Sequence, residues 1–457
     1  MMKKIFAVMI LLALTVFIVG CRGDETPPVT GDTAPPQQQA GQVEPGPGDV
    51  TPPAPGAATE LVLWHIQTDG PRAAIIQDAV DRFVASNPNY TVNVVPIMND
   101  VYKQQLIIAM AANELPDIFM SWSGGPMIEY INAGHLFDLT SLVDASDLRN
   151  RLLEAGMAQG THNGRVYGIP GESVAIAALF YNRQLFADLG ISAPTTIPEL
   201  EQVAETLIAN NIIPFALANH NRWTGSMYYM NLATRFGGLE PFQGAVSGAG
   251  SFHDESFTVA ANTIQDWVNR GFFAEGVNGL NEDLGESRQL MYARAAGMHV
   301  MGNWFVSQVL GENPDFFYDL GVVRFPAWTN SPANQNIVIG TVGDNFYHVS
   351  ANSVSPEGAF RLITYMVDDV AMQRRLEAGA IPPIIGVADM LGNPLLQEIM
   401  RIVQDAPAVQ LWYDQYLPSA VAEAHLSSLQ QVFGLTITAN DMNTAKQTAI
   451  EAYRAGN

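Results

Sequence analysis

Three short apolar stretches decide the fold class of this 457-residue chain: ELVLW (60–64), TVNVVPI (91–97) and PDIFMSW (116–122). Each is typical of a buried strand. A helix is predicted after the first stretch by apolar residues at helical spacing, namely Ile75, Ile76, Ala79, Val80 and Phe83. A second helix, over about 101–113, separates the other two stretches. This alternation of strand and helix predicts parallel pairing in an α/β sheet.

Later segments carry clear helix signals. Thr196-Ile197-Pro198-Glu199 has the residues of a capping box with an early proline, so it predicts a helix start. The stretch from Ser355-Pro356 to Gly379 is predicted to be one further helix. The last third is mostly helical in pattern and contains no repeat. Because residues 59–457 are too many for one typical domain, we expect two lobes.

The chain has a single cysteine, Cys21, which follows Lys3, Lys4 and an apolar run from Ile5 to Val19. Ile18-Val19-Gly20-Cys21 resembles the bacterial lipobox, which implies a signal peptide over 1–20 and an acylated Cys21, carrying palmitate, as the mature N-terminus. The run is shorter than the roughly 20 residues of a membrane-spanning helix. An ordinary secretory signal that happens to contain a cysteine is the alternative.

The segment 21–58 differs sharply in composition from the rest. It holds nine prolines and no aromatic residue after Arg22, so a disordered, extended linker is predicted. The formal charge of the chain is −23, and removal of residues 1–20 deletes two lysines and takes it to −25. This acidity argues against nucleic acid or an anionic membrane surface as a binding partner.

Motifs of several enzyme and metal-site classes are missing. The chain has no HExxH, CxxC, P-loop or GxSxG, and its eight histidines lack metal-ligand spacing. We therefore predict no cofactor and no metal. The many carboxylates leave a glycosidase pair open, because sequence does not fix the separation that such a pair needs.

Tryptophans gather where ligands of α/β proteins bind. Open α/β sheets hold ligands at the carboxyl ends of their strands. Five tryptophans lie at apparent strand ends or beside glycine, proline and polar residues, namely Trp64, Trp122, Trp223, Trp304 and Trp412. An indole covers the apolar face of a sugar ring, while Asn, Asp, Glu and His bond its hydroxyls. Any one of them could be a core residue, but the set favours a sugar site.

Several longer stretches carry a family resemblance through their order and spacing: ELVLWH, LPDIFMSWSGG, YGIPGESVAIAALFYNRQLFADLGISAPTTIPEL, AAGMHVMGNWFVSQV and VQLWYDQYLPSAVAEA. From Glu60 to its C-terminus the chain resembles a bacterial extracellular solute-binding protein of family 1, a carbohydrate ABC transporter substrate-binding lipoprotein. The resemblance implies an α/β, two-lobe, periplasmic-binding-protein-like fold with hinge crossovers and a ligand cleft between the lobes.

The resemblance also implies boundaries. Crossovers are expected near 177–182, over 320–325 and after Phe360. Lobe one would comprise 59–178 plus 325–365, and lobe two 179–324 plus 366–457.

Ligand contacts implied by the resemblance fall in the loops at strand ends and beside the crossovers. Trp304, Asp414, Trp122 and Trp223 are the leading candidates. The full set is Trp64, His65, Asp69, Trp122, Ser123, Glu172, Asn219, Trp223, Asn303, Trp304, Asp344, Trp412 and Asp414.

The expected function is that of a lipid-anchored binding component of an ABC transporter on the extracytoplasmic face of the cell membrane. It would bind a sugar or oligosaccharide by lobe closure without turnover, act as a monomer, and meet the membrane permease in its closed form. Two alternatives stay open: an anchored polysaccharide hydrolase, or the same fold binding a non-sugar solute such as a polyamine, peptide or metal ion.

Overall fold

The structure, a computed structural model, describes residues 58–68 and 70–456. These residues fall within one compact unit, Pro55–Asn457. The predicted signal peptide, Cys21, the predicted linker up to residue 57, and Asp69 lie outside the described residues. Within the described ranges, no helix combines the length and the apolar composition needed to cross a bilayer.

A five-stranded sheet is built around the first predicted strand, in the order β2-β1-β3-β12-β6. β1 pairs in parallel with both β2 and β3, which confirms the pairing predicted from the three apolar stretches. β12 joins β3, and β6 joins β12, in antiparallel fashion. The strands are β1 (Thr59–His65), β2 (Tyr90–Pro96), β3 (Ile118–Ser121), β12 (Phe346–Val349) and β6 (Ile169–Pro170).

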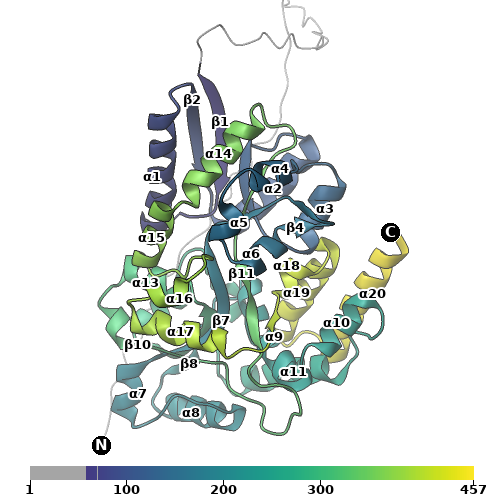
Figure 1. Cartoon of the computed structure of the whole chain (residues 1–457). Helices are drawn as coiled ribbons and strands as arrows, with labels where there is room; N and C mark the ends of the chain where they lie inside the picture. Colours follow the sequence, from purple (N-terminus) through teal and green to yellow (C-terminus); the bar gives the residue numbers. More distant parts are fainter. Residues whose placement is uncertain (1–57, 69, 457) are drawn as a thin grey trace, which may run out of the picture. The chain divides into compact units, whose positions relative to one another are not determined.

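Helices pack on this first sheet (Figure 1). α1 (Gly70–Ser86) buries Ile75, Ile76, Ala79, Val80 and Phe83, the residues whose spacing predicted it. α2 (Asn99–Ala112) confirms the second predicted helix. The shorter elements of this region are α3 (Gly125–Asn132), α4 (Thr140–Asp144), α5 (Leu148–Arg151), α6 (Glu154–Gln159) and the hairpin of β4 (Thr161–His162) and β5 (Arg165–Val166).

The prediction of one helix from Ser355 to Gly379 is wrong, because the segment forms two helices. α14 (Pro356–Met366) ends before Asp368, and α15 (Asp369–Glu377) begins there. The Asp368 side chain accepts a hydrogen bond from the Ala371 backbone N–H at 2.9 Å and so caps the second helix. Asp368 also pairs with Arg82 of α1, which fixes the break against the first sheet's helical cover.

A second, six-stranded sheet has the order β13-β11-β7-β9-β8, with β10 also paired to β7. β7 runs antiparallel to its neighbours β9, β10 and β11. Nine of its ten residues are buried, as expected of a strand that is covered on both faces. The strands are β7 (Ser173–Asn182), β8 (Ile213–Phe215), β9 (Ala296–Gly302), β10 (Leu320–Val323), β11 (Val338–Gly343) and β13 (Val409–Gln410).

The helices around the second sheet include α8 (Ile197–Ala209), whose predicted capping box is confirmed: Thr196 and Glu199 bond each other's backbone N–H groups. The mostly helical last third is confirmed as well. The other helices are α7 (Arg183–Leu189), α9 (Trp223–Gly237), α10 (Glu240–Ser247), α11 (Glu255–Asn269), α12 (Glu286–Tyr292), α13 (Phe305–Glu312), α16 (Val387–Met390), α17 (Pro394–Gln404), α18 (Tyr413–Tyr416), α19 (Ser419–Phe433) and α20 (Ala439–Gly456).

Each sheet has its own apolar core, so the chain has two lobes of α/β structure. One large core surrounds the six-stranded sheet, and two smaller ones flank the five-stranded sheet. The lobe boundaries stay a prediction. The sheets show which core some of these segments join. All of β7 and β11 belong to the six-stranded sheet, whereas Met372 of α15 packs in a core of the five-stranded sheet.

Candidate functional site

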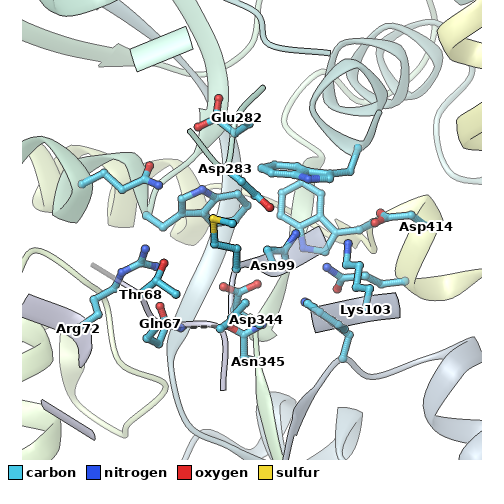
Figure 2. Close-up of a pocket in the computed structure, with 18 of the residues that line it drawn as sticks. Gln67, Thr68, Arg72, Asn99, Lys103, Glu282, Asp283, Asp344, Asn345 and Asp414 are labelled. Atoms are coloured by element: carbon cyan, nitrogen blue, oxygen red, sulfur yellow. Dashed lines mark hydrogen bonds between the residues drawn. The ribbon is translucent and has the colours of Figure 1, made fainter. Parts of the chain in front are cut away.

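A cavity of about 320 Å³ lies between residues of the two lobes. One side comes from the ends of β1 and β3, the start of α2 and the β11–β12 loop. The other comes from α9, α12, α13 and the segment that follows β13. Figure 2 shows Gln67, Asp344 and Asn345 on one side of the cavity, facing Glu282 and Asp283 on the other.

Three tryptophans form a continuous aromatic wall on the second lobe. Trp223 begins α9, Trp304 directly precedes α13, and Trp412 precedes α18. The Trp304 ring lies between the other two, with centroid distances of 6.1 Å to Trp223 and 6.0 Å to Trp412. These residues are far apart in the sequence, and the sheet brings them together at one end.

A glycine makes room for the central tryptophan. A Cβ atom on Gly302 would lie 2.1 Å from the Trp304 ring, closer than any two unbonded carbon atoms approach. The GNW sequence therefore has a packing reason: the indole folds back over the end of β9, and only a residue without a side chain fits beneath it.

Three buried polar atoms around the cavity have no hydrogen-bond partner among residues 58–68 and 70–456. They are Nε1 of Trp223, Nε1 of Trp412 and Oε1 of Gln308, and all three residues line the cavity. Buried polar groups are normally paired, because an unpaired one loses its hydration without replacement. Two N–H donors and one carbonyl acceptor of residues that line the cavity are thus unpaired within the described part of the chain.

The first-lobe wall consists of short polar side chains. Gln67 Nε2 donates to Asn345 Oδ1 at 3.4 Å, and both residues are almost fully buried. Thr68 and Asn99 lie beside them on the cavity wall (Figure 2). Amide and hydroxyl groups both donate and accept hydrogen bonds. This wall can therefore match a ligand that carries several hydroxyls.

Charged groups surround this polar wall in two arrangements. Arg288 is paired, at 2.5 Å with Glu282 and at 3.0 Å with Glu312. Asp344 and Asp414 instead face the cavity, and Lys103 lies near Asp414 (Figure 2). Burial raises the pKa of Asp414, and Lys103 opposes the rise. Lys103 also stacks over the Trp122 ring at 4.8 Å.

Asp344 is held in a rare backbone conformation, with a φ of 48°. Such values favour glycine, asparagine and aspartate, and they concentrate at functional sites. Burial, and then the neighbouring Glu172, raise the pKa of Asp344 to about 7, although Arg72 and Lys103 act in the other direction. Its carboxyl group can therefore donate as well as accept a hydrogen bond near neutral pH.

The lobes touch each other beside the cavity, at the start of α2. Met98 precedes this helix and supplies no side-chain cap. Asp283 of the second lobe accepts the Asp100 backbone N–H at 3.0 Å instead. Asn221 donates to the Asp100 carboxylate at 2.8 Å and accepts the Glu282 N–H at 2.7 Å. The N-terminus of α2 is thus capped from the opposite lobe.

Six of the predicted site residues line the cavity: Trp122, Trp223, Trp304, Asp344, Trp412 and Asp414. Asp69 lies outside the described residues. The structure places the other six elsewhere: Trp64, His65, Ser123, Glu172, Asn219 and Asn303.

Two of the six are asparagines that bond the protein itself. Asn303 accepts from the Ile176 N–H at 2.8 Å and donates to the Val174 carbonyl at 3.0 Å, so it ties the end of β9 to β7. Asn219 accepts from the Gly225 N–H at 3.1 Å, near the start of α9. Their polar atoms hold neighbouring backbone in place rather than face the cavity.

Glu172 forms a buried ion pair with Arg375 at 2.8 Å and accepts the Tyr347 hydroxyl at 2.5 Å. It therefore holds the loop before β7 against α15, which carries Arg375, and against β12, which carries Tyr347.

The remaining three belong to the first-lobe core. Trp64 packs in an apolar cluster, and Ser123 is buried. His65 accepts the Gln67 N–H on Nδ1 at 3.1 Å. Burial lowers the pKa of His65 to about 4, in spite of nearby Glu172, so its ring is neutral at pH 7. His65 thus shapes the turn that carries Gln67 to the cavity.

The sequence interpretation missed Gln67, Asn99, Gln308 and Asn345. Gln67 follows β1 by two residues, and Asn345 lies between β11 and β12, so both obey the strand-end rule that selected the tryptophans.

Comparison with known proteins identifies the family of the chain. Residues 68–373 match the sequence profile of the bacterial extracellular solute-binding proteins. The chain belongs to this family. Members of this family are extracellular binding proteins. The match confirms the resemblance expected from the sequence.

The relatives described next cover between 70% and 99% of this solute-binding protein. An uncharacterized ABC transporter extracellular-binding protein of Pyrococcus horikoshii is 23% identical over 466 residues, covering 99% of this chain and 96% of the relative. The multiple sugar-binding protein of Streptococcus mutans is 23% identical over 335 residues, covering 70% and 75%. The solved structure of a chitin oligosaccharide binding protein superimposes with a TM-score of 0.81 and 25% identity, over 87% of this chain and 100% of that one.

Proposed function

We propose that this solute-binding protein is the substrate-binding component of an ABC transporter and binds a sugar or oligosaccharide in the cavity between its lobes. The observation that carries the proposal is the aromatic wall with its unpaired polar atoms: Trp223, Trp304 and Trp412, with two unpaired indole N–H groups. The sugar-binding relatives named above support the same ligand class.

The two walls suit the two faces of a sugar. The C–H face of a pyranose ring is apolar and packs on an indole, while the hydroxyls around its rim need donors and acceptors. Gln67 and Asn345 provide such groups opposite the tryptophans. A bound hydroxyl would also pair the free N–H groups of Trp223 and Trp412, which removes the free-energy cost of leaving them unpaired.

A ligand in this cavity contacts both lobes, so it favours the arrangement in which the lobes are close. Binding is then a population shift between open and closed states, and its size depends on how much tighter the closed state binds. We expect the closed form, as a monomer, to be the one that the membrane permease recognises.

Anchoring at the membrane is part of the proposal, on the strength of the lipobox-like sequence before Cys21. Acylated Cys21 would hold the protein on the extracytoplasmic face, and residues 22–58 would form its tether. Cys21→Ala should move the protein from the membrane fraction to the soluble fraction or block its processing. A domain that begins at Thr59 should bind ligand normally. Unchanged membrane association of Cys21→Ala would contradict the anchor.

A thermal-shift screen tests the ligand class. The panel contains mono- and oligosaccharides, with amino acids, peptides and polyamines as controls, and intrinsic tryptophan fluorescence follows each hit. We expect saturable stabilisation and a fluorescence change with saccharides only, and chromatography should detect no shortened product. Stabilisation by polyamines or peptides alone would refute sugar binding, and shortened oligosaccharides would indicate a hydrolase instead.

A further inference from the structure

A second groove lies next to the cavity and has about twice its volume. It encloses about 670 Å³, compared with about 320 Å³ for the cavity. Met98 and Asp283 line both, so the two spaces adjoin each other. Like the cavity, the groove has one wall from α2 of the first lobe and another from loops and helix α19 of the second lobe.

Amide side chains dominate the chemistry of this groove. Gln104 lies on the first-lobe wall, and Asn281 and Gln431 lie on the second-lobe wall. Asn281 uses its carbonyl to accept the Asp283 N–H at 2.9 Å, and Gln431 uses its amino group to donate to Ser427 O at 3.2 Å. The Asn281 amino group and the Gln431 carbonyl therefore remain for a ligand, as does the exposed amide of Gln104.

Exposed apolar side chains lie among these amides. Met98 and Val101 on the α2 side are 43% and 41% exposed, and Leu284 on the opposite side is 65% exposed. Large apolar residues that gather on two facing walls indicate a contact surface. Amides next to aliphatic side chains match the alternation of hydroxyl and C–H surface along a saccharide chain. His220 lines the groove, but no tryptophan, tyrosine or phenylalanine among the described residues does, which distinguishes it from the cavity.

The contact between the lobes sets the geometry of the groove. Asp283 bonds the Asp100 backbone, and Asn221 bonds the Asp100 carboxylate, at the border between the groove and the cavity. In this arrangement of the lobes, the contact that borders the cavity therefore also holds the two walls of the groove together. A ligand in the cavity thus has a formed polar groove next to it.

We propose that this groove binds further units of the same oligosaccharide whose first units stack on the tryptophans in the cavity. The inference rests on the proposed function and adds chain length to it: the protein selects saccharides longer than the cavity holds. The cavity gives most of the affinity, and the groove gives preference for long chains over short ones.

The test measures how affinity depends on chain length. Isothermal titration measures the affinity for chito-, xylo- and malto-oligosaccharides, each from the monosaccharide to the hexasaccharide. The series that binds most tightly is then used for the variants. The wild-type protein should gain about tenfold or more in affinity beyond the length that fills the cavity. The double variant Gln104→Ala/Gln431→Ala should lose about tenfold for long chains and change little for short ones.

Both substituted positions lie on helices, where alanine is favourable, so the variant should fold. Gln105→Ala, at an exposed α2 position outside the groove, is the matched control and should keep the full length dependence. An affinity that stops rising once the cavity is filled would overturn the groove assignment and leave sugar binding intact. So would equal losses for short and long chains, or no loss at all. Absence of binding by any saccharide would overturn both proposals.

Discussion

The two walls of the cavity differ in how they are built. On the second lobe, Trp223, Trp304 and Trp412 pack against each other and against the large core. On the first lobe, the wall consists of single polar side chains from three separate loops or element ends, such as Gln67 and Asn345. An aromatic surface attracts any ring with an apolar face, whereas hydrogen bonds depend on where each hydroxyl points. The aromatic wall of the second lobe thus supplies affinity, and the polar wall of the first lobe supplies discrimination.

Loss of the central tryptophan should have the largest effect. Trp304→Ala removes the ring that contacts both other indoles, and a stacked, buried aromatic contributes about 2–3 kcal/mol to binding. We expect affinity for every bound saccharide to fall by about 30-fold or more, as measured by titration calorimetry. Trp328→Ala is the control, because Trp328 packs on Phe236 away from the cavity. If Trp304→Ala bound saccharides as tightly as the wild type, the aromatic wall would not be the source of affinity.

A methyl group beneath the same ring should act nearly as strongly. Gly302→Ala places a Cβ where the Trp304 ring lies, so the indole must turn away. We expect about a tenfold loss of affinity, with a shifted tryptophan emission spectrum. Gly279→Ala is the matched control, because its Cβ would meet no atom within 4 Å. Unaltered emission and affinity in Gly302→Ala would show that the ring position is not essential.

A change on the polar wall should alter selectivity more than affinity. Gln67→Ala removes an amide whose net contribution is about 1 kcal/mol, so the mean loss should be about fivefold. The loss should differ between epimeric sugars, because only one epimer directs its hydroxyl at this position. Competition titrations with epimer pairs measure the difference. An equal loss for both epimers would assign discrimination to the tryptophans instead.

The smallest expected effect is on the thermal stability of the protein, which the buried carboxyl group of Asp344 lowers at high pH. Burial raises the pKa of Asp344 from 3.8 to about 7, so the folded protein binds this proton more tightly than the unfolded chain does. Stability therefore falls as pH rises through this window. Asp344→Asn keeps the backbone conformation accessible and should raise Tm by about 2 °C at pH 8 but not at pH 4. The exposed control Asp315→Asn should show no such difference, and a gain at both pH values would contradict the titration of Asp344.

The fold was largely predictable because its signals are local. Ile75, Ile76, Ala79, Val80 and Phe83 lie within nine residues and share one face of α1, which is all that periodicity needs. The break at Asp368 was missed, although a capping residue is a local signal too. Its partner Arg82 lies 286 residues away, and no sequence pattern reveals that pairing.

The site was predictable only in part, for the same reason. Trp304 and Asn303 are neighbours at one strand end, yet the indole lines the cavity and the amide holds β7. The difference depends on Ile176, 127 residues earlier in the chain. Glu172 was selected for its loop position, and its partner Arg375 follows 203 residues later. A polar residue in a promising loop serves the ligand or the scaffold according to partners that folding brings near.

The cap that Asp283 places on α2 has a thermodynamic consequence for the empty protein. When the lobes separate, the Asp100 N–H loses its acceptor, and Met98 offers no replacement. A missing cap destabilises a helix by about 1 kcal/mol, which corresponds to roughly a fivefold change in an equilibrium constant. If the lobes open and close as proposed, this contact favours the closed arrangement of the unliganded protein independently of any sugar. Under the proposed function, its strength would set how often the permease meets a closed binding protein that holds no ligand.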